Sequence, residues 1–162
     1  MKSKKMILFL TTIVMGLTAG IFYCWSISVT RGLALLPDKE YITAFQALNR
    51  AILNPMFLLC FMGLVFLLPL SAFTTWHKPL PAAFWLLCAA SLIYIIGVMG
   101  VTMAGNVPMN DALDKFNAAT ASPSDLAAKR AGFEATWNFL NNIRTVSCVI
   151  SFALTVGAGM LR

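Results

Sequence analysis

The chain has 162 residues, of which 59% are hydrophobic and 11% are charged. Soluble domains contain about 45–50% apolar and about 25% charged residues, so this composition excludes a water-soluble globule. The net charge of +6 does not indicate a nucleic-acid partner, because the Lys and Arg residues flank apolar stretches and form no basic patch interleaved with aromatic residues. We expect the lipid bilayer as the partner, no nucleic acid, and a single membrane domain over residues 1–162.

Four apolar stretches are long enough to cross a bilayer, and Arg144 is the only charged residue within them. About 20 helical residues cross a hydrocarbon core of about 30 Å, and continuous rather than alternating apolarity favours helices over a barrel. The sequence therefore predicts an all-α fold, an integral membrane four-helix bundle. The predicted spans are approximately residues 6–30, 52–76, 82–104 and 143–161.

The first stretch follows a basic N-terminus, as the hydrophobic region of a secretory signal peptide does. Its apolar run is far longer than the about 7–15 residues of such a region, and no A-x-A-like site follows it, so we expect a retained first span. Pro37 should end this helix, and Asp38 should cap an amphipathic helix along the membrane surface. Near Pro55 that helix should join the second span through a proline kink.

The polar residues between the third and fourth spans predict two further helices. Asn106 and Pro108 indicate a turn that leads into a short helix. Ser122, Pro123 and Asp125 are typical of a helix start, with Ser as N-cap, Pro at the first position and an acid at the third. The helix that begins there should continue toward the fourth span. Residues 31–51 and 105–142 together form the predicted outer cap of the bundle.

The positions of the basic residues predict the orientation. One side of the predicted bundle holds five short, near-membrane basic residues and no acid; they are Lys2, Lys4, Lys5, Lys78 and Arg162. Because such residues favour the cytoplasm, we expect both termini to be cytoplasmic and the cap to be extracytoplasmic. The expected location is a bacterial cytoplasmic (inner) membrane, in which the protein is multi-pass.

Small residues recur every fourth position in the first and fourth spans, which allows helix backbones to approach closely. They are Thr12, Gly16, Gly20, Cys24 and Ser28, and Ser147, Ser151, Thr155 and Gly159. We favour seams inside the bundle, while a homodimer contact through these faces stays open.

The sequence contains few of the residues that metal binding, thiol redox chemistry or ion transport require. His77 is the only histidine, there is no C-x-x-C pair, and the spans contain no carboxylate. A soft copper site built from Cys24, Cys60 and Cys148 with neighbouring Met residues remains an alternative, but ordinary apolar packing is the favoured interpretation. We expect no metal and no cofactor.

Amides gather in the outer cap, and they allow two interpretations. In the structural one, favoured from the residues alone, the cap is hydrogen-bonded to itself, and Arg144 binds loop carbonyls or pairs with an acid. In the functional one, a pocket mouth lies between bundle and cap, where Arg144 and the amides orient a substrate oxygen. Trp137 or Tyr23 would then stack on a planar ligand.

Three motifs occur in order between the spans: FQALNR at residues 45–50, GNVPMN at 105–110 and WNFLNNIRT at 137–145. Together they resemble the anthrone-oxygenase-like family of small integral membrane proteins, long classed as a domain of unknown function. The resemblance covers nearly the whole chain and implies a four-helix membrane bundle. For a fungal branch it implies oxygenation of anthrones to anthraquinones without a conventional cofactor.

The resemblance also implies site residues. The matching motif positions are Gln46, Asn49, Asn106, Pro108, Asn110, Trp137, Arg144 and Thr145. We expect Arg144, Asn106 and Asn110 as catalytic residues that polarise a substrate oxygen. The expected substrate-binding residues are Gln46, Asn49, Trp137, Asn141 and Thr145. One departure is plain: members often have a histidine shortly before the motif arginine, and this chain has Asn141 and Asn142 there.

Two functions follow as hypotheses. The first is a cofactor-independent oxygenase or related oxidoreductase acting on a lipophilic aromatic, anthrone-like substrate. The alternative is a non-catalytic membrane protein that binds a lipophilic ligand or a partner through its outer cap. A transporter is disfavoured because the spans lack intramembrane acids and four spans would have to dimerise to form a path.

A reporter fused within residues 116–126 tests the predicted orientation. A periplasmic enzyme reporter at this place should be active, whereas the same reporter fused next to Lys78 should be inactive. An inactive fusion at residues 116–126, together with an active fusion next to Lys78, would contradict the extracytoplasmic cap.

Overall fold

The computed structural model describes residues 2–161, with side chains from residue 4 onward. Within these residues the chain forms helices and connecting segments and no strand. In chain order the elements are α1 (Lys2–Cys24), the π-helix η1 (Trp25–Val29), α2 (Thr30–Ala34), α3 (Asp38–Ile52), α4 (Pro55–Thr75), α5 (Ala82–Ile93), the π-helices η2 (Tyr94–Gly100) and η3 (Thr102–Asn106), α6 (Val107–Asp114) and α7 (Pro123–Met160).

These elements join into four helical arms that are long and apolar enough to cross a membrane: Lys4–Ala34, Pro55–Thr75, Ala82–Asp114 and Pro123–Met160. Large apolar side chains such as Leu59 and Phe66 point outward on these arms, each 73% exposed. A continuous apolar exterior of this kind belongs in lipid. The chain is therefore a multi-pass integral membrane protein with a helical bundle, as predicted.

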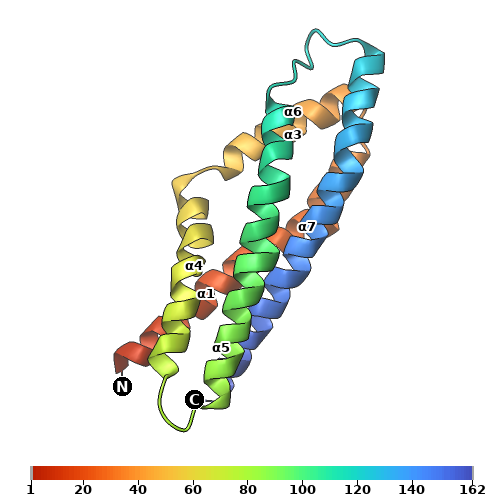
Figure 1. Cartoon of the computed structure of the whole chain (residues 1–162). Coiled ribbons are helices and arrows are strands. Elements are labelled where there is room, and N and C mark those ends of the chain that lie inside the picture. The colour runs from red at the N-terminus through yellow and green to blue at the C-terminus, as the bar shows by residue number, and fades with distance from the viewer. Residues whose placement is uncertain (1, 162) are drawn as a thin grey trace.

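The longest helix, α7, organises the bundle. Its 38 residues extend about 57 Å at about 1.5 Å per residue, well beyond the about 30 Å of a hydrocarbon core. One half packs against α1, α5 and η2, and the other half packs against α3 and α6. The start of α1 and the end of α7 lie at one end of the bundle, while α6 and the segment that leads to α7 lie at the other (Figure 1).

Helix α3 crosses this second end and joins α6 and α7 in the cap (Figure 1). Its amphipathic pattern buries Tyr41, Ile42 and Phe45 against α7. On α3, Gln46 Nε2 donates to the backbone carbonyls of Leu113 and Phe116 at 2.7 and 2.8 Å. These bonds join α3 to the last turn of α6 and to the segment after it, where the Leu113 carbonyl also accepts from the Phe116 N–H at 3.0 Å.

The predicted helix ends are correct in part. Ser122 caps α7, and its Oγ accepts from the Asp125 backbone N–H at 3.2 Å. Asp38 is not a cap but the first residue of α3, and its carboxylate binds Arg130 instead. Near Pro55 the chain does not kink but breaks, because Asn54 caps α4 by accepting from the Phe57 N–H at 3.0 Å.

The turn predicted at Asn106 and Pro108 is also absent, since η3 runs directly into α6. The wide π-helical turn shifts the hydrogen-bond register just before Pro108, which lacks a backbone N–H to donate. Another π-helix, η1, interrupts the first arm between α1 and α2. Inserted π turns of this kind change which side chains face the bundle interior.

The third arm packs tightly against α7 at Gly97. A Cβ atom placed on Gly97 would overlap Ser147 Oγ and lie 2.7 Å from Ser147 Cβ. This contact belongs to the predicted seam of small residues on α7, which also includes Ser151, whose Oγ donates to the Ala90 carbonyl at 3.1 Å. The α7 stripe therefore packs inside the bundle from Ser147 to Thr155, while Gly159 at its end is exposed.

We predict that Gly97→Ala lowers the free energy of unfolding by about 1–3 kcal/mol, as overpacking typically does. Thermal unfolding in detergent measures the effect. Gly63→Ala is the matched control, because nothing lies within 4 Å of a Cβ there. Ser147→Gly removes both clashing atoms and should restore the stability of the Gly97→Ala protein. A Gly97→Ala protein as stable as the control would contradict this packing.

Candidate functional site

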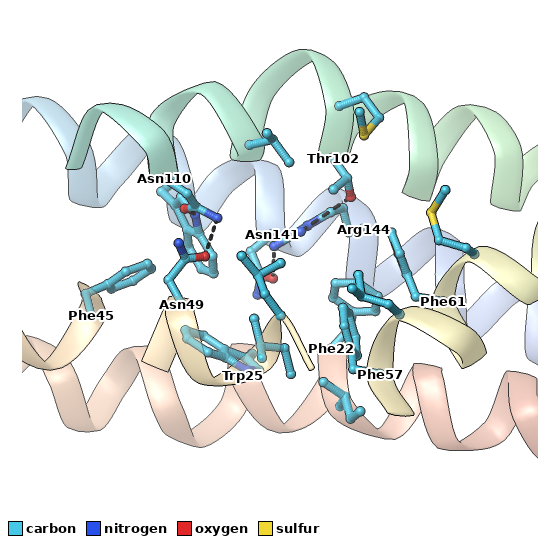
Figure 2. A pocket seen from close by; sticks show the side chains of 18 residues that line it. Phe22, Trp25, Phe45, Asn49, Phe57, Phe61, Thr102, Asn110, Asn141 and Arg144 are labelled. Carbon is cyan, nitrogen blue, oxygen red and sulfur yellow. Dashed lines mark hydrogen bonds between the residues drawn. The ribbon is translucent and has the colours of Figure 1, made fainter. Parts of the chain in front are cut away.

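A cavity of about 170 Å³ lies where the cap meets the bundle. Side chains from all four membrane arms and from α3 line it, and Figure 2 shows ten of them converging on one space. An apolar cavity of about 150 Å³ suffices to hold benzene. The cavity is only partly enclosed, so a larger ring system can extend toward its open side.

The walls of the cavity are mainly aromatic. Phe57 and Phe61 of α4 stack at a centroid distance of 5.3 Å, and Phe22 lies 6.1 Å from Phe61. On the cap side, Trp25 lies 5.4 Å from Trp137. Rings of this kind favour offset or edge contacts with another planar ring, so the walls suit a flat aromatic molecule.

Arg144 is the one cation among the residues that line the cavity, and it is 7% exposed. Its guanidinium lies over the rings of Phe22 and Trp137, at 4.8 and 5.3 Å from their centroids. Nη2 donates to Asn141 Oδ1 at 2.8 Å, and Nη1 makes a long bond of 3.4 Å to Thr102 Oγ1 (Figure 2). Nε is buried and has no hydrogen-bond partner.

Asn141 connects Arg144 to the first arm. Its Nδ2 donates to Ser26 Oγ at 2.9 Å, and the hydroxyls of Ser26 and Thr145 share a hydrogen bond of 2.8 Å. Because Ser26 accepts from Asn141, its own proton is free for Thr145, whose hydroxyl lies 3.0 Å from the Phe22 carbonyl. Ser26 belongs to η1 and Thr102 begins η3, so π-helical segments supply polar groups on two sides of Arg144.

Asn110 forms a second bridge, on the cap side of the cavity. Its Oδ1 accepts from Trp137 Nε1 at 2.7 Å, and its Nδ2 donates to Asn49 Oδ1 at 2.8 Å (Figure 2). The three side chains come from α6, α7 and α3, and all of them line the cavity. The bridge therefore fixes the Trp137 ring in one orientation.

The predicted site residues fall into two groups. Those that line the cavity are Arg144, Asn110, Asn49, Trp137 and Asn141. The others lie behind or outside it: Gln46 holds the end of α6, Thr145 bonds toward α1, and Asn106 is fully buried with a long bond from Nδ2 to the Trp137 carbonyl. Tyr23, the alternative stacking residue, is 53% exposed and does not line the cavity.

Sequence reasoning missed most of the walls. Phe22 and Trp25 on the first arm, and Phe57 and Phe61 on α4, line the cavity, but in the sequence they look like any aromatic residue of a membrane span. Thr102 was missed for the same reason. The nearby Pro108 and the polar stretch that follows were the available signals that this end of the third arm is unusual.

The cap contains a contrasting arginine, Arg130. It donates to the Leu36 and Ala34 carbonyls at 2.7 and 2.9 Å and pairs with Asp38 and Glu134 at 3.1 and 2.7 Å. Loop carbonyls and acids are the partners that the structural interpretation expected for Arg144. Arg144 has none of them: the ion pairs of residues 4–161 join Arg50 to Asp114 and Arg130 to its two acids.

The phenol of Tyr41 in the cap does not act as a base at neutral pH. Burial, with a further contribution from the Glu134 carboxylate, raises the pKa of Tyr41 in the cap well above its ordinary value, so this phenol stays neutral. Within the described part of the chain, no group of three or more His, Cys, Asp or Glu side chains is placed to hold a metal ion.

We predict that Asn141→Ala lowers the free energy of unfolding by about 1–3 kcal/mol, because it leaves buried polar partners on Ser26 and Arg144 unsatisfied. The neighbouring Asn142→Ala is the matched control, since Asn142 is exposed. Thermal unfolding of both proteins in the same detergent measures the difference. Equal midpoints would mean that the amide bridge contributes nothing to stability.

Comparison with known proteins gives one family. The sequence model of the family described as anthrone oxygenase matches residues 45–154, which include the second half of α3, all of α4 and the third arm, and most of α7. Comparisons with curated proteins and with solved structures gave no significant match. The matched region contains Arg144 with Asn141 and Thr102, the three residues of the Asn110 bridge, and most of the cavity lining, while Phe22, Trp25 and Ser26 of the first arm lie outside it. The chain belongs to the anthrone oxygenase family.

Proposed function

We propose that the protein is a cofactor-independent oxygenase that acts on a lipophilic aromatic, anthrone-like substrate in the cavity. The observation that carries this proposal is a single buried guanidinium, Arg144, at the end of a cavity with aromatic walls. Family membership supports this reaction class, and the cavity suits a planar molecule that carries an oxygen at one edge.

In the proposed reaction, a ring methylene of the substrate becomes a carbonyl. The carbon loses two hydrogens and gains one atom of dioxygen, and the other oxygen atom leaves as water. Dioxygen is the oxidant, so no external reductant is needed. The substrate's existing oxygen gains negative charge when the methylene proton leaves, and donors fixed in an apolar site stabilise such charge most effectively.

The residues have distinct proposed roles. Arg144 contacts the substrate oxygen as the catalytic cation, with Asn110 as a second polar contact, and Trp137 and Asn49 bind the rings and edge of the substrate. Asn141 holds the guanidinium in place through its 2.8 Å bond. Asn106, Gln46 and Thr145 act as positioning residues, because their amide and hydroxyl groups bond to backbone or bundle partners behind the cavity.

We also propose that the cap faces the extracytoplasmic side of a bacterial cytoplasmic membrane and that both termini are cytoplasmic. The asymmetric distribution of near-membrane basic residues supports this orientation. In the outer part of the first arm, Gly20, Cys24 and Ser28 are exposed. We propose this face, rather than the buried stripe of α7, as the contact for a second copy of the chain.

Oxygen uptake with an anthrone panel tests the function. The purified protein in detergent or lipid nanodiscs should consume dioxygen and release the quinone, and Arg144→Gln should lower kcat by about 10²-fold, as loss of an oxyanion donor does. Arg50→Ala is the matched control and should retain activity, because Arg50 is an exposed cap residue paired with Asp114 outside the cavity.

The outcomes separate the two functional hypotheses. No turnover across the panel, combined with a lipophilic molecule that co-purifies with the wild type and not with Arg144→Gln, would overturn the enzyme and favour a binding protein. Thermal unfolding of each variant excludes a loss of activity through misfolding.

A further inference from the structure

Within residues 4–161, no carboxylate pairs with Arg144. All six acids of the chain lie between residues 38 and 134. On α7 the nearest of them, Glu134, is ten residues away, about 15 Å along the helix. A buried charge without a counter-ion is strongly unfavourable unless hydrogen bonds and a partner compensate for it. The Arg144 side chain can therefore still form an ion pair with an anion that enters the cavity.

The hydrogen-bond partners of Arg144 are neutral, so they do not cancel its charge. Asn141 Oδ1 and Thr102 Oγ1 accept hydrogen bonds from the guanidinium without carrying charge. The rings of Phe22 and Trp137 offer only cation–π contacts. Nε remains without a partner, and the guanidinium forms part of the cavity lining. An oxygen that enters the cavity can thus meet a donor that is charged and already oriented.

The rim of the cavity is apolar and exposed, in contrast to the charged and buried Arg144. Leu53 and Met103 are 59% and 58% exposed, and Leu58 and Met62 are also exposed while lining the cavity. Leu58 and Met62 belong to α4, and Met103 belongs to η3, so the rim faces the lipid between two membrane arms. A molecule that fits this gradient has an apolar body toward the lipid and an anionic atom at the deep end.

We infer that the cavity binds its ligand as an aromatic oxyanion, a phenolate or enolate, with the charged oxygen against Arg144 and the rings toward the rim formed by Leu58, Met62 and Met103. This inference rests on the proposed function and deepens it. A bound anion does not need a protein base beside it, because the guanidinium favours the ionised form and the proton can leave to water. The pocket selects the reactive form of the ligand by charge.

A matched pair of small ligands tests the inference without turnover. The probe is 2-naphthol, whose phenolate absorbs at longer wavelength than its neutral form, and the control is 2-methoxynaphthalene, which has nearly the same shape and cannot ionise. The protein is placed in zwitterionic lipid nanodiscs, because these add no surface charge. Quenching of Trp25 and Trp137 in a Trp76→Phe/Trp85→Phe protein reports binding, since both remaining indoles line the cavity.

The naphthol should bind at least about tenfold more tightly as its phenolate than as the neutral form. Its apparent pKa should therefore fall by at least about one unit relative to protein-free nanodiscs, the equivalent of a tenfold preference. Binding of the methoxy compound should not depend on pH. Arg144→Gln should abolish the shift, and Arg144→Lys should restore part of it because the charge is kept while the planar fork is lost.

An unchanged naphthol pKa in the wild-type protein, or the same shift in Arg144→Gln, would overturn the inference. The wild-type comparison of the two ligands needs no variant, so it decides even if Arg144→Gln does not fold. Oleate supplies an aliphatic anion as a further arm: tighter competition by oleate than by naphtholate would overturn the aromatic assignment. A lowered naphthol pKa without oxygen uptake on anthrones would support the inference and refute the oxygenase. Oxygen uptake with an unchanged naphthol pKa would support the oxygenase and refute the inference.

Discussion

The structure depends on a guanidinium that is buried where the cap meets the membrane arms, without an acid beside it. Arg144 is 7% exposed and would be strongly destabilising if its donors had no acceptors. Asn141 and Thr102 supply acceptors from two arms, and Asn141 in turn fixes Ser26 on the first arm. The same side chain therefore determines how α7 faces α1 and η3, and how the cavity between them is shaped.

The two interior arginines of α7 show why sequence alone left the site ambiguous. Arg130 and Arg144 lie on one helix, and either could have closed a hydrogen-bonded cap. Arg130 does so, because Glu134 follows one turn later and the 34–38 segment presents its carbonyls and Asp38. Arg144 has an amide one turn before it and Cys148, rather than an acid, one turn after it. The local sequence on the same helix decides the difference, but the partners from other arms become visible only in the fold.

Particular residues show how far the sequence reaches. The apolar runs predict four membrane helices, and Ser122 with Pro123 predicts the start of α7, because both depend on local chemistry. The cavity walls depend on the register in which the membrane arms meet. The π-helical turns that begin at Trp25 and Thr102 alter this register, and the apolar pattern of the sequence does not reveal these turns. Gln46 and Asn49 have similar amides, yet one bonds to backbone carbonyls and the other lines the cavity.

The asparagine before Arg144 has a chemical consequence of its own. Asn141 lies one turn before Arg144 and accepts the guanidinium's hydrogen bond at 2.8 Å. A carboxylate in that position would neutralise the arginine, and a protonated imidazole would repel it. A neutral amide holds the cation firmly while leaving its charge for another molecule. Asn141 therefore preserves the electrostatic field of Arg144, and an apolar cavity is where that field acts most strongly.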